Sequence, residues 1–531
     1  MRYPQLSVFS VLAAAALHNL AKPLAPPWDD IRVKHTWNAV PPDWETLGHP
    51  PTGTTIDLHL ALKSHHESAL IDALHEVSDP RSPKHVLSNT PPRMTYSCVP
   101  LLRYRYGAHL SKEQVAQLVA PHPDTFELIN SWLEHHGVPS SSISTTQGGS
   151  WLMLTGVPVS QANELLGASY QLYRRTGTND TAILRTIGYA LPAVLHTHVQ
   201  TVVPTTYFAS TLTLWQTPQR RSFGEITDMA SREPVTVLSS RYDEVTPSYL
   251  RSLYRTAAYV PAATDRNRLG VAGFLNNYPS PADLTTFLME WRTAAVDTTL
   301  TVVQINNGPY DPSHPTIEGN LNIQYTQAMA YPTPHTFYST GGEMSVIPGS
   351  NQPARGDTWL EWLIYVLTQP DVPQTISISY GVQEKILPLE YATTLCRLFA
   401  QLGARGVSVI FASGDHGIGN GDCKVNDGSG RVQFIPLFPA TCMCGIVFLL
   451  GSSIPSQAKV AHHIATVSQV PGSRAWAARQ AGTPRSRRAS PGAASRTISR
   501  ARTTRTMTYP SSCITSADSM MARTSAFSAM T

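Results

Sequence analysis

Charged side chains are scarce in this sequence, because Asp, Glu, Lys and Arg together make up only 14% of its 531 residues. So low a charged fraction is unusual for a cytosolic enzyme. No apolar run is long enough to span a bilayer, while an apolar content of 42% excludes a wholly disordered chain. The spacings C-x-x-C, H-E-x-x-H and G-x-S-x-G are also absent. Their absence argues against a structural zinc site, a zinc-peptidase helix and a hydrolase nucleophile elbow.

Acidic residues are almost missing from residues 443–531, which hold ten Arg, one Lys and a single acid, Asp518. This stretch therefore carries a net charge of +10, whereas the first 442 residues carry −6, and the overall value of +4 describes neither part. A basic excess confined to one tail is weak support for nucleic-acid binding by the rest of the chain. We expect neither a nucleic-acid partner nor a membrane partner.

The N-terminus has the pattern of a secretion signal. Arg2 precedes an apolar run over residues 6–17, and small residues up to Ala21 offer cleavage sites. The alternative is an N-terminal helix that packs on the body of the protein. We predict a signal peptide over residues 1–21 and a secreted, extracellular protein. The six Cys of a secreted protein are expected to form disulfides, but their spacing leaves the pairing open.

Residues 28–210 alternate short strand and helix patterns, which predicts a small α+β unit. The clearest strand pattern lies at 56–62, where apolar side chains recur at every second position. The other expected elements are helices over 67–77, 126–137 and 160–167, a helix that follows Ser111 as its N-cap, and a strand over 151–156. Residues 211–244 form a polar linker.

Residues 245–442 have an α/β pattern instead. Strands are predicted over 300–305, 374–380 and 406–412, with helices over 283–294, 358–367 and 388–402, the last of them ended by Gly403. A strand, a helix and a second strand joined by short connections imply parallel pairing. Beyond Cys442 no helix or strand periodicity is present, so residues 443–531 are predicted to be a disordered basic tail.

Two segments carry candidate chemistry, since sites in parallel sheets form beyond the carboxyl ends of the strands. If a helix starts near Glu318, then Glu318 and Asn322 lie on one face of it, four residues apart. A simpler interpretation makes Glu318 a helix-capping carboxylate. Asp415 lies between glycines just after the strand that ends at Ala412, where an ordinary turn is the simpler interpretation.

Together these segments resemble the sedolisin family of serine-carboxyl peptidases, and most of all its fungal secreted tripeptidyl-peptidases. The matching stretches of the peptidase part are 246–254, 269–274, 318–325, 332–342, 376–381, 398–415 and 434–442. The stretches that resemble the family's activation propiece are 77–83, 110–114 and 185–192.

The resemblance implies a subtilisin-like parallel α/β domain over 245–442 behind a propiece over 28–210. It implies cleavage of peptide or protein substrates at acidic pH, with the chain's own propiece as a second partner. It also implies a base at Glu318 and an oxyanion-stabilising acid at Asp415. The Asp that orients the base corresponds to Asn322, which can form a hydrogen bond but cannot share a titrating proton.

Two further features of the family are not found in this sequence. The nucleophilic Ser is expected in a Ser-Gly-Thr-Ser run well past Glu318, and no such run follows Cys442. Calcium is the cofactor expected for the family, but the region of its ligands holds one acid here. We therefore expect the chain as written to be an inactive, C-terminally truncated peptidase, with a non-catalytic secreted pseudopeptidase as the alternative.

Residues 86–105 interrupt the propiece match, and we interpret them as an unspliced insertion. The tail over 443–531 is interpreted as a reading-frame slip, because an Arg-, Ala- and Ser-rich composition is what a shifted frame of a GC-rich gene tends to give.

Sequencing the transcript tests both interpretations. We expect the mature message to lack the codons for residues 86–105 and to continue after codon 442 in another frame. An in-frame spliced message that encodes this tail would refute the frame-slip interpretation.

Overall fold

The computed structural model describes residues 27–41, 43–66, 68–78, 107–146, 148–177, 182–208, 246–342, 358–412, 425, 429–433 and 436–442. The predictions that lie outside these residues concern the signal peptide, the linker 211–244, the segment 86–105, the tail 443–531 and Asp415.

The first unit, residues 27–208, is built around a four-stranded antiparallel sheet with the order β4-β5-β3-β9. Its strands are β3 (Thr55–Leu62), β4 (Ile143–Thr145), β5 (Trp151–Pro158) and β9 (Val199–Val203). The strand pattern predicted for β3 is confirmed, since Ile56, Leu58 and Leu60 are all fully buried at every second position.

Smaller sheets and four helices complete this unit. Strands β2 (Trp44–Gly48), β6 (Gln171–Arg175) and β7 (Ile183–Arg185) form one sheet, and β1 (Ile31–Thr36) pairs with β8 (Gly188–Pro192). The helices are α1 (Ala69–Ser78), α2 (Lys112–Leu118), α3 (Asp124–His135) and α4 (Val159–Leu166). The predicted N-cap is confirmed, because the Ser111 side chain accepts from Gln114 N and the Gln114 side chain accepts from Ser111 N.

The second unit contains a five-stranded, fully parallel sheet with the order β11-β12-β10-β13-β15. Its strands are β10 (Leu269–Gly273), β11 (Leu300–Ile305), β12 (His335–Thr340), β13 (Thr375–Ile378) and β15 (Ser408–Phe411). Strand β14 (Val382–Gln383), which follows β13 in the chain, forms a short antiparallel pair with β16 (Leu437–Phe438). The predicted parallel pairing of the last two long strands is confirmed.

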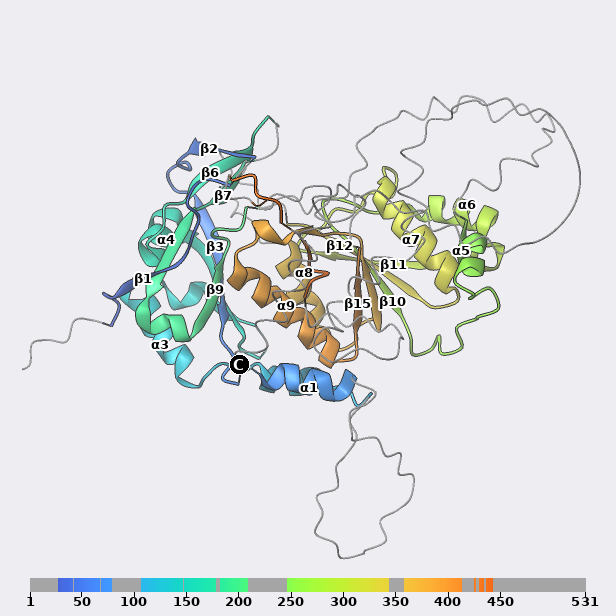
Figure 1. The fold of residues 1–531 in the computed structure, drawn as a ribbon, viewed down its shortest axis with the longest axis horizontal. Helices are drawn as coiled ribbons and strands as arrows, with labels where there is room; N and C mark the ends of the chain where they lie inside the picture. The colour runs from blue at the N-terminus through green and yellow to red at the C-terminus, as the bar shows by residue number, and fades with distance from the viewer. Residues whose placement is uncertain are drawn as a thin grey trace, which may run out of the picture.

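Helices cover both faces of the parallel sheet (Figure 1). On one face, α6 (Pro281–Trp291) and α7 (Ile317–Ala330) share a core with Val271 of β10 and Phe337 of β12. On the other face, α8 (Thr358–Thr368) and α9 (Leu389–Ala404) bury Trp359, Trp362 and Phe399. Burial of each such side chain stabilises the fold by about 2–3 kcal/mol. Helix α5 (Pro247–Leu253) precedes the sheet on the α7 side.

The predicted end of the α9 helix, at residue 402, is wrong by two residues. The helix continues through Gly403 to Ala404, and Arg405 is its C-cap. The glycine that needs a left-handed backbone is Gly406, with φ +87°. Gly403 is buried inside the helix instead, because packing there overrides the low helix propensity of glycine.

The two units share apolar cores across α8 and α9. Trp151 and Tyr207 of the first unit belong to the same buried cluster as the residues of α8 and α9, and the Tyr207 ring stacks on Tyr391 with centroids 4.4 Å apart. Farther along α9, Ala400 and Ala404 pack against apolar residues of α1 and α2. The chain thus forms one continuous body from β1 to β16 (Figure 1).

A cavity of about 180 Å³ remains in this interface. Trp151 lines it from the first unit and Leu398 from α9, while Lys112 and Arg405 lie at its polar side. Lys112 Nζ also donates to Thr368 O at 2.7 Å, so two residues that line the cavity form a polar contact between the units.

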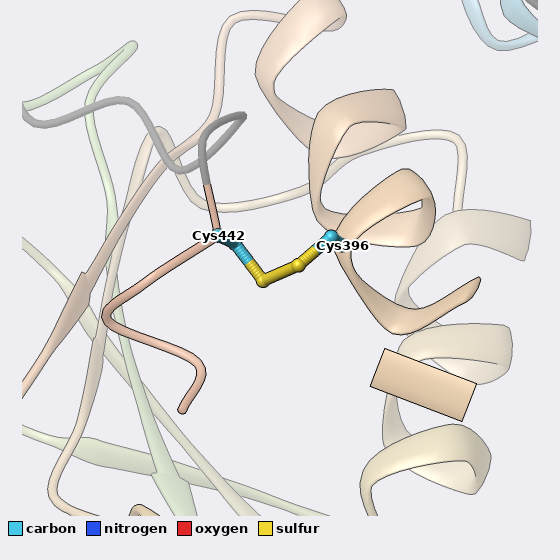
Figure 2. The surroundings of a disulfide bond; sticks show 2 residues. All are labelled: Cys396 and Cys442. Atoms are coloured by element: carbon cyan, nitrogen blue, oxygen red, sulfur yellow. A yellow bond between two sulfur atoms is a disulfide. The ribbon is translucent and has the colours of Figure 1, made fainter. Parts of the chain in front are cut away.

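A disulfide joins Cys396, in α9, to Cys442, just beyond β16 (Figure 2). The bond closes a loop with a sequence separation of 46 residues. Cross-links of this length stabilise folded proteins by about 2–4 kcal/mol. Of the cysteine pairings that the sequence left open, this one is settled.

The expected fold class is confirmed: an α/β unit with a parallel sheet flanked by helices follows an α+β unit. Within the described ranges, no helix is both long and apolar enough to cross a bilayer.

His335, the first residue of β12, makes the fold sensitive to acid. Its side chain is 2% exposed, and Nδ1 lies 2.8 Å from Thr333 O. Burial lowers the pKa of His335 to about 4. Between the usual value of about 6.5 and this value, the unfolded chain binds a proton that the folded protein does not. The free energy of unfolding therefore falls as the pH drops from about 6.5 to 4, by up to about 3 kcal/mol.

We expect His335→Asn, whose amide can still donate to Thr333 O, to remove most of this dependence. Urea unfolding of the wild type should show about 2 kcal/mol less stability at pH 4.5 than at pH 7.5 beyond the difference found for the variant. Equal pH dependence in both proteins would contradict the assignment to His335.

Candidate functional site

The first turn of α7 is fixed to the segment that follows β10. Thr316, its N-cap, accepts from Gly319 N at 3.2 Å and from Tyr278 N at 3.1 Å. Thr316 N in turn donates to Tyr278 O at 3.0 Å. A Cβ on Gly319 would lie 2.4 Å from the backbone of Tyr278, so only glycine allows this close approach. These contacts fix the start of α7 against the segment that follows β10.

Glu318 and Asn322 are neighbours on α7, as their spacing predicts. Asn322 Nδ2 donates to Glu318 Oε1 at 3.0 Å, and both residues are partly buried. On the far side of the amide, Ser379 Oγ donates to Asn322 Oδ1 at 3.0 Å. Since Ser379 directly follows β13, two hydrogen bonds connect the edge of the sheet to Glu318.

Tyr380 follows Ser379 in the chain and lies near enough to Glu318 to feel its charge. Its ring is fully buried, and its hydroxyl donates to Phe274 O, just beyond β10, at 3.2 Å. Burial is the main cause that raises the pKa of Tyr380, and the negative charge of Glu318 raises it further. Tyr380 is therefore neutral under all ordinary conditions, and its charge state does not compete with that of Glu318.

The site lies at a switch point of the sheet. From β10 the chain passes through α6 to β11 on one face, while from β13 it passes through α9 to β15 on the other. Neighbouring strands whose connections leave in opposite directions form a crevice at their carboxyl ends, where α/β proteins bind ligands. Glu318 and Asn322 face this edge through the contact with Ser379.

Asp415 lies outside the described residues. The last described residue before it is Ala412, whose N–H donates to Ile378 O at 3.0 Å and so follows the end of β13. Asp415 comes three residues later in the sequence, and its place beside Glu318 stays a prediction.

A metal site is not found in the described part of the chain, where no group of three or more His, Cys, Asp or Glu could hold an ion. No residue of the described site is therefore assigned to calcium.

Three residues of this site were not predicted from the sequence to have a role in it: Thr316, Ser379 and Tyr380. The rule that would have found Ser379 is the one that singled out Asp415, because both residues follow the carboxyl end of a parallel strand. The contact between Asn322 and Ser379 joins residues 57 positions apart, and no local spacing reveals it.

Comparisons with known proteins find similarity to an activation domain and to tripeptidyl-peptidases. The family model described as Pro-kumamolisin, activation domain, matches residues 103–208. Tripeptidyl-peptidase SED2 of Arthroderma otae is 32% identical over 433 residues, which cover 80% of this chain and 67% of the relative.

Two further relatives give the same picture. Probable tripeptidyl-peptidase SED2 of Trichophyton verrucosum is 32% identical over 414 residues, covering 76% of this chain and 64% of the relative. Tripeptidyl-peptidase SED4 of Arthroderma otae is 29% identical over 424 residues, covering 78% and 64%. The chain spans about two thirds of the length of these relatives.

Gly319 offers a test of how firmly the helix start is positioned. We expect Gly319→Ala to lower the free energy of unfolding by about 2 kcal/mol, because the new methyl group collides with the Tyr278 backbone. Ile317→Ala is the matched control, since that side chain is 86% exposed and its loss should change stability by less than about 0.5 kcal/mol. Equal unfolding midpoints for the two variants would show that α7 does not need this contact.

Proposed function

Because the chain belongs to the sedolisin family, we propose that it is made as the zymogen of an acid-acting serine-type peptidase of the tripeptidyl-peptidase kind. Such an enzyme releases tripeptides from the N-terminus of peptide or protein substrates. The observation that carries the proposal is the contact between Glu318 and Asn322 at the carboxyl edge of the parallel sheet.

In this proposal Glu318 is the general base that takes a proton from the nucleophile. A carboxylate in the place of the usual His works best where carboxyl groups titrate, which explains the acidic working range. Asp415 stabilises the oxyanion and can donate a hydrogen bond only when protonated. Asn322 orients Glu318 through the bond of 3.0 Å but cannot share its proton.

The proposed organisation follows the same logic. Residues 1–21 direct secretion, residues 28–210 form the propiece, and the linker 211–244 is cut when residues 245–442 become the peptidase domain. The match of an activation-domain model to residues 103–208 supports the propiece. Calcium is proposed for the complete peptidase domain of the family.

A second candidate function is a non-catalytic pseudopeptidase that binds peptides or its own propiece. Asn322 favours it, because this amide stands at the position of the family's orienting Asp inside a well-matched stretch. The Ser-Gly-Thr-Ser run that would supply the nucleophile is also not found in the sequence.

We predict that the purified chain, as its sequence stands, releases no product at pH 4–5 from a peptide with a free N-terminus and a fluorescent group after its third residue. The matched control is the Glu318→Gln variant, which should give the same baseline. Product release that depends on Glu318 would refute the expected inactivity and support the peptidase function directly.

A fusion of residues 28–442 to the C-terminal third of Tripeptidyl-peptidase SED2 of Arthroderma otae separates the two candidate functions. In this fusion, Asn322→Asp should increase the rate at pH 4–5 on the order of 100-fold or more, because an orienting carboxylate is restored. Glu318→Gln should abolish the rate in the same background. A folded fusion that carries Asn322→Asp and remains inactive would favour the pseudopeptidase.

A further inference from the structure

Ser379, Asn322 and Glu318 form a directed series of hydrogen bonds from the end of β13 to the start of α7. We propose that Ser379 is a positioning residue, whose hydroxyl group acts through the amide of Asn322 to hold Glu318 in its ionised form. The proposal rests on the proposed function, in which Glu318 is the base. Its test does not use peptidase activity.

The direction of the series follows from the chemistry of the three groups. An ionised carboxylate only accepts hydrogen bonds, so the amide of Asn322 must turn its NH₂ group toward Glu318. The amide oxygen then faces Ser379 and requires a donor, which the hydroxyl supplies at 3.0 Å. The positive end of the hydroxyl dipole therefore points along the series toward Glu318.

A hydrogen bond accepted by an amide oxygen polarises the amide and makes its NH₂ group a better donor. The strengthening is about 10–30% per bond. It acts on a bond to a charged group, which is stronger than a bond between neutral groups. Removal of the Ser379 hydroxyl should therefore weaken the stabilisation of ionised Glu318 and raise its pKa by about 0.4 unit.

Other charged and titratable groups face α7 from the elements packed against it. Tyr380 follows β13 and is neutral, α6 contributes Asp283, and α5 contributes Arg251. Asp283 accepts from the amide of Asn320 on α7, and Arg251 donates to backbone carbonyl groups. None of these bonds involves the Ser379 hydroxyl, so its removal tests the series alone.

The experiment is a pH titration of the Glu318 carboxyl carbon by NMR in the full chain, with the signal assigned from the Glu318→Gln variant. We expect Ser379→Ala to raise the pKa of Glu318 by about 0.4 unit. Ser379→Thr keeps the hydroxyl and should restore the wild-type value. If the alanine variant does not fold, Ser379→Cys, a weaker donor of similar size, should shift the pKa in the same direction.

Two matched controls separate this role from a general structural effect. Thr326→Val removes a hydroxyl that donates to the backbone oxygen of Asn322 at 2.7 Å, not to its amide oxygen, and should leave the pKa unchanged. In an Asn322→Leu background, Ser379→Ala should also have no effect, because no amide remains to carry it.

An unchanged pKa in the Ser379→Ala variant would overturn the proposal. A shift of the same size from Thr326→Val, or in the Asn322→Leu background, would overturn it as well. If the folded Asn322→Asp fusion is inactive while the titration gives the expected shifts, the peptidase function is refuted and the role of Ser379 stands.

Discussion

Helices α8 and α9 are packed on two sides at once, and the rest of the structure depends on this double contact. Their inner side covers the parallel sheet with Trp359, Trp362 and Phe399. Their outer side carries the first unit, through Tyr391 at one end of α9 and Ala400 and Ala404 at the other. The first unit also has a core of its own around Trp132 and Leu154, and its Trp151 and Tyr207 join the core of α8 and α9, so these helices connect the two units.

The candidate site depends on the same arrangement from the opposite face. Helix α7 supplies Glu318 and Asn322 from one layer, while Ser379 directly follows β13, from which the chain continues to α9. The hydrogen bond between Asn322 and Ser379 therefore depends on how α7 is placed relative to the carboxyl end of β13. The close approach of Gly319 to Tyr278 fixes one layer, and the propiece contacts of α9 help to fix the other.

Much of this fold follows from local pattern, and the exceptions have physical reasons. The amphipathic helices and the β-branched strands β11, β13 and β15 have clear periodicity, and the structure has them at the predicted positions with ends that differ by up to three residues. Strands β10 and β12 were matched only through the family resemblance, because glycines in one and His335 in the other break the apolar run. Their strand character comes from burial in the centre of the sheet, which is a tertiary effect.

For the candidate site, spacing predicted that Glu318 and Asn322 share a helix face, because helix periodicity is a local property. It could not predict Ser379 as the partner of Asn322, since that contact depends on how β13 lies beside β10. Residues 413–424 lie outside the described part of the chain, so the place of Asp415 remains a prediction from resemblance.

The disulfide between Cys396 and Cys442 has a consequence for how this protein would respond to proteolytic nicking. The bond makes a covalent ring of the chain from α9 through β15 to β16, and Asp415 belongs to this ring by its sequence position. A single backbone cut inside the ring leaves both pieces attached. The two pieces would separate on a gel only after reduction. Until then, β15 and β16 would stay covalently linked to α9 whichever side of them is cut.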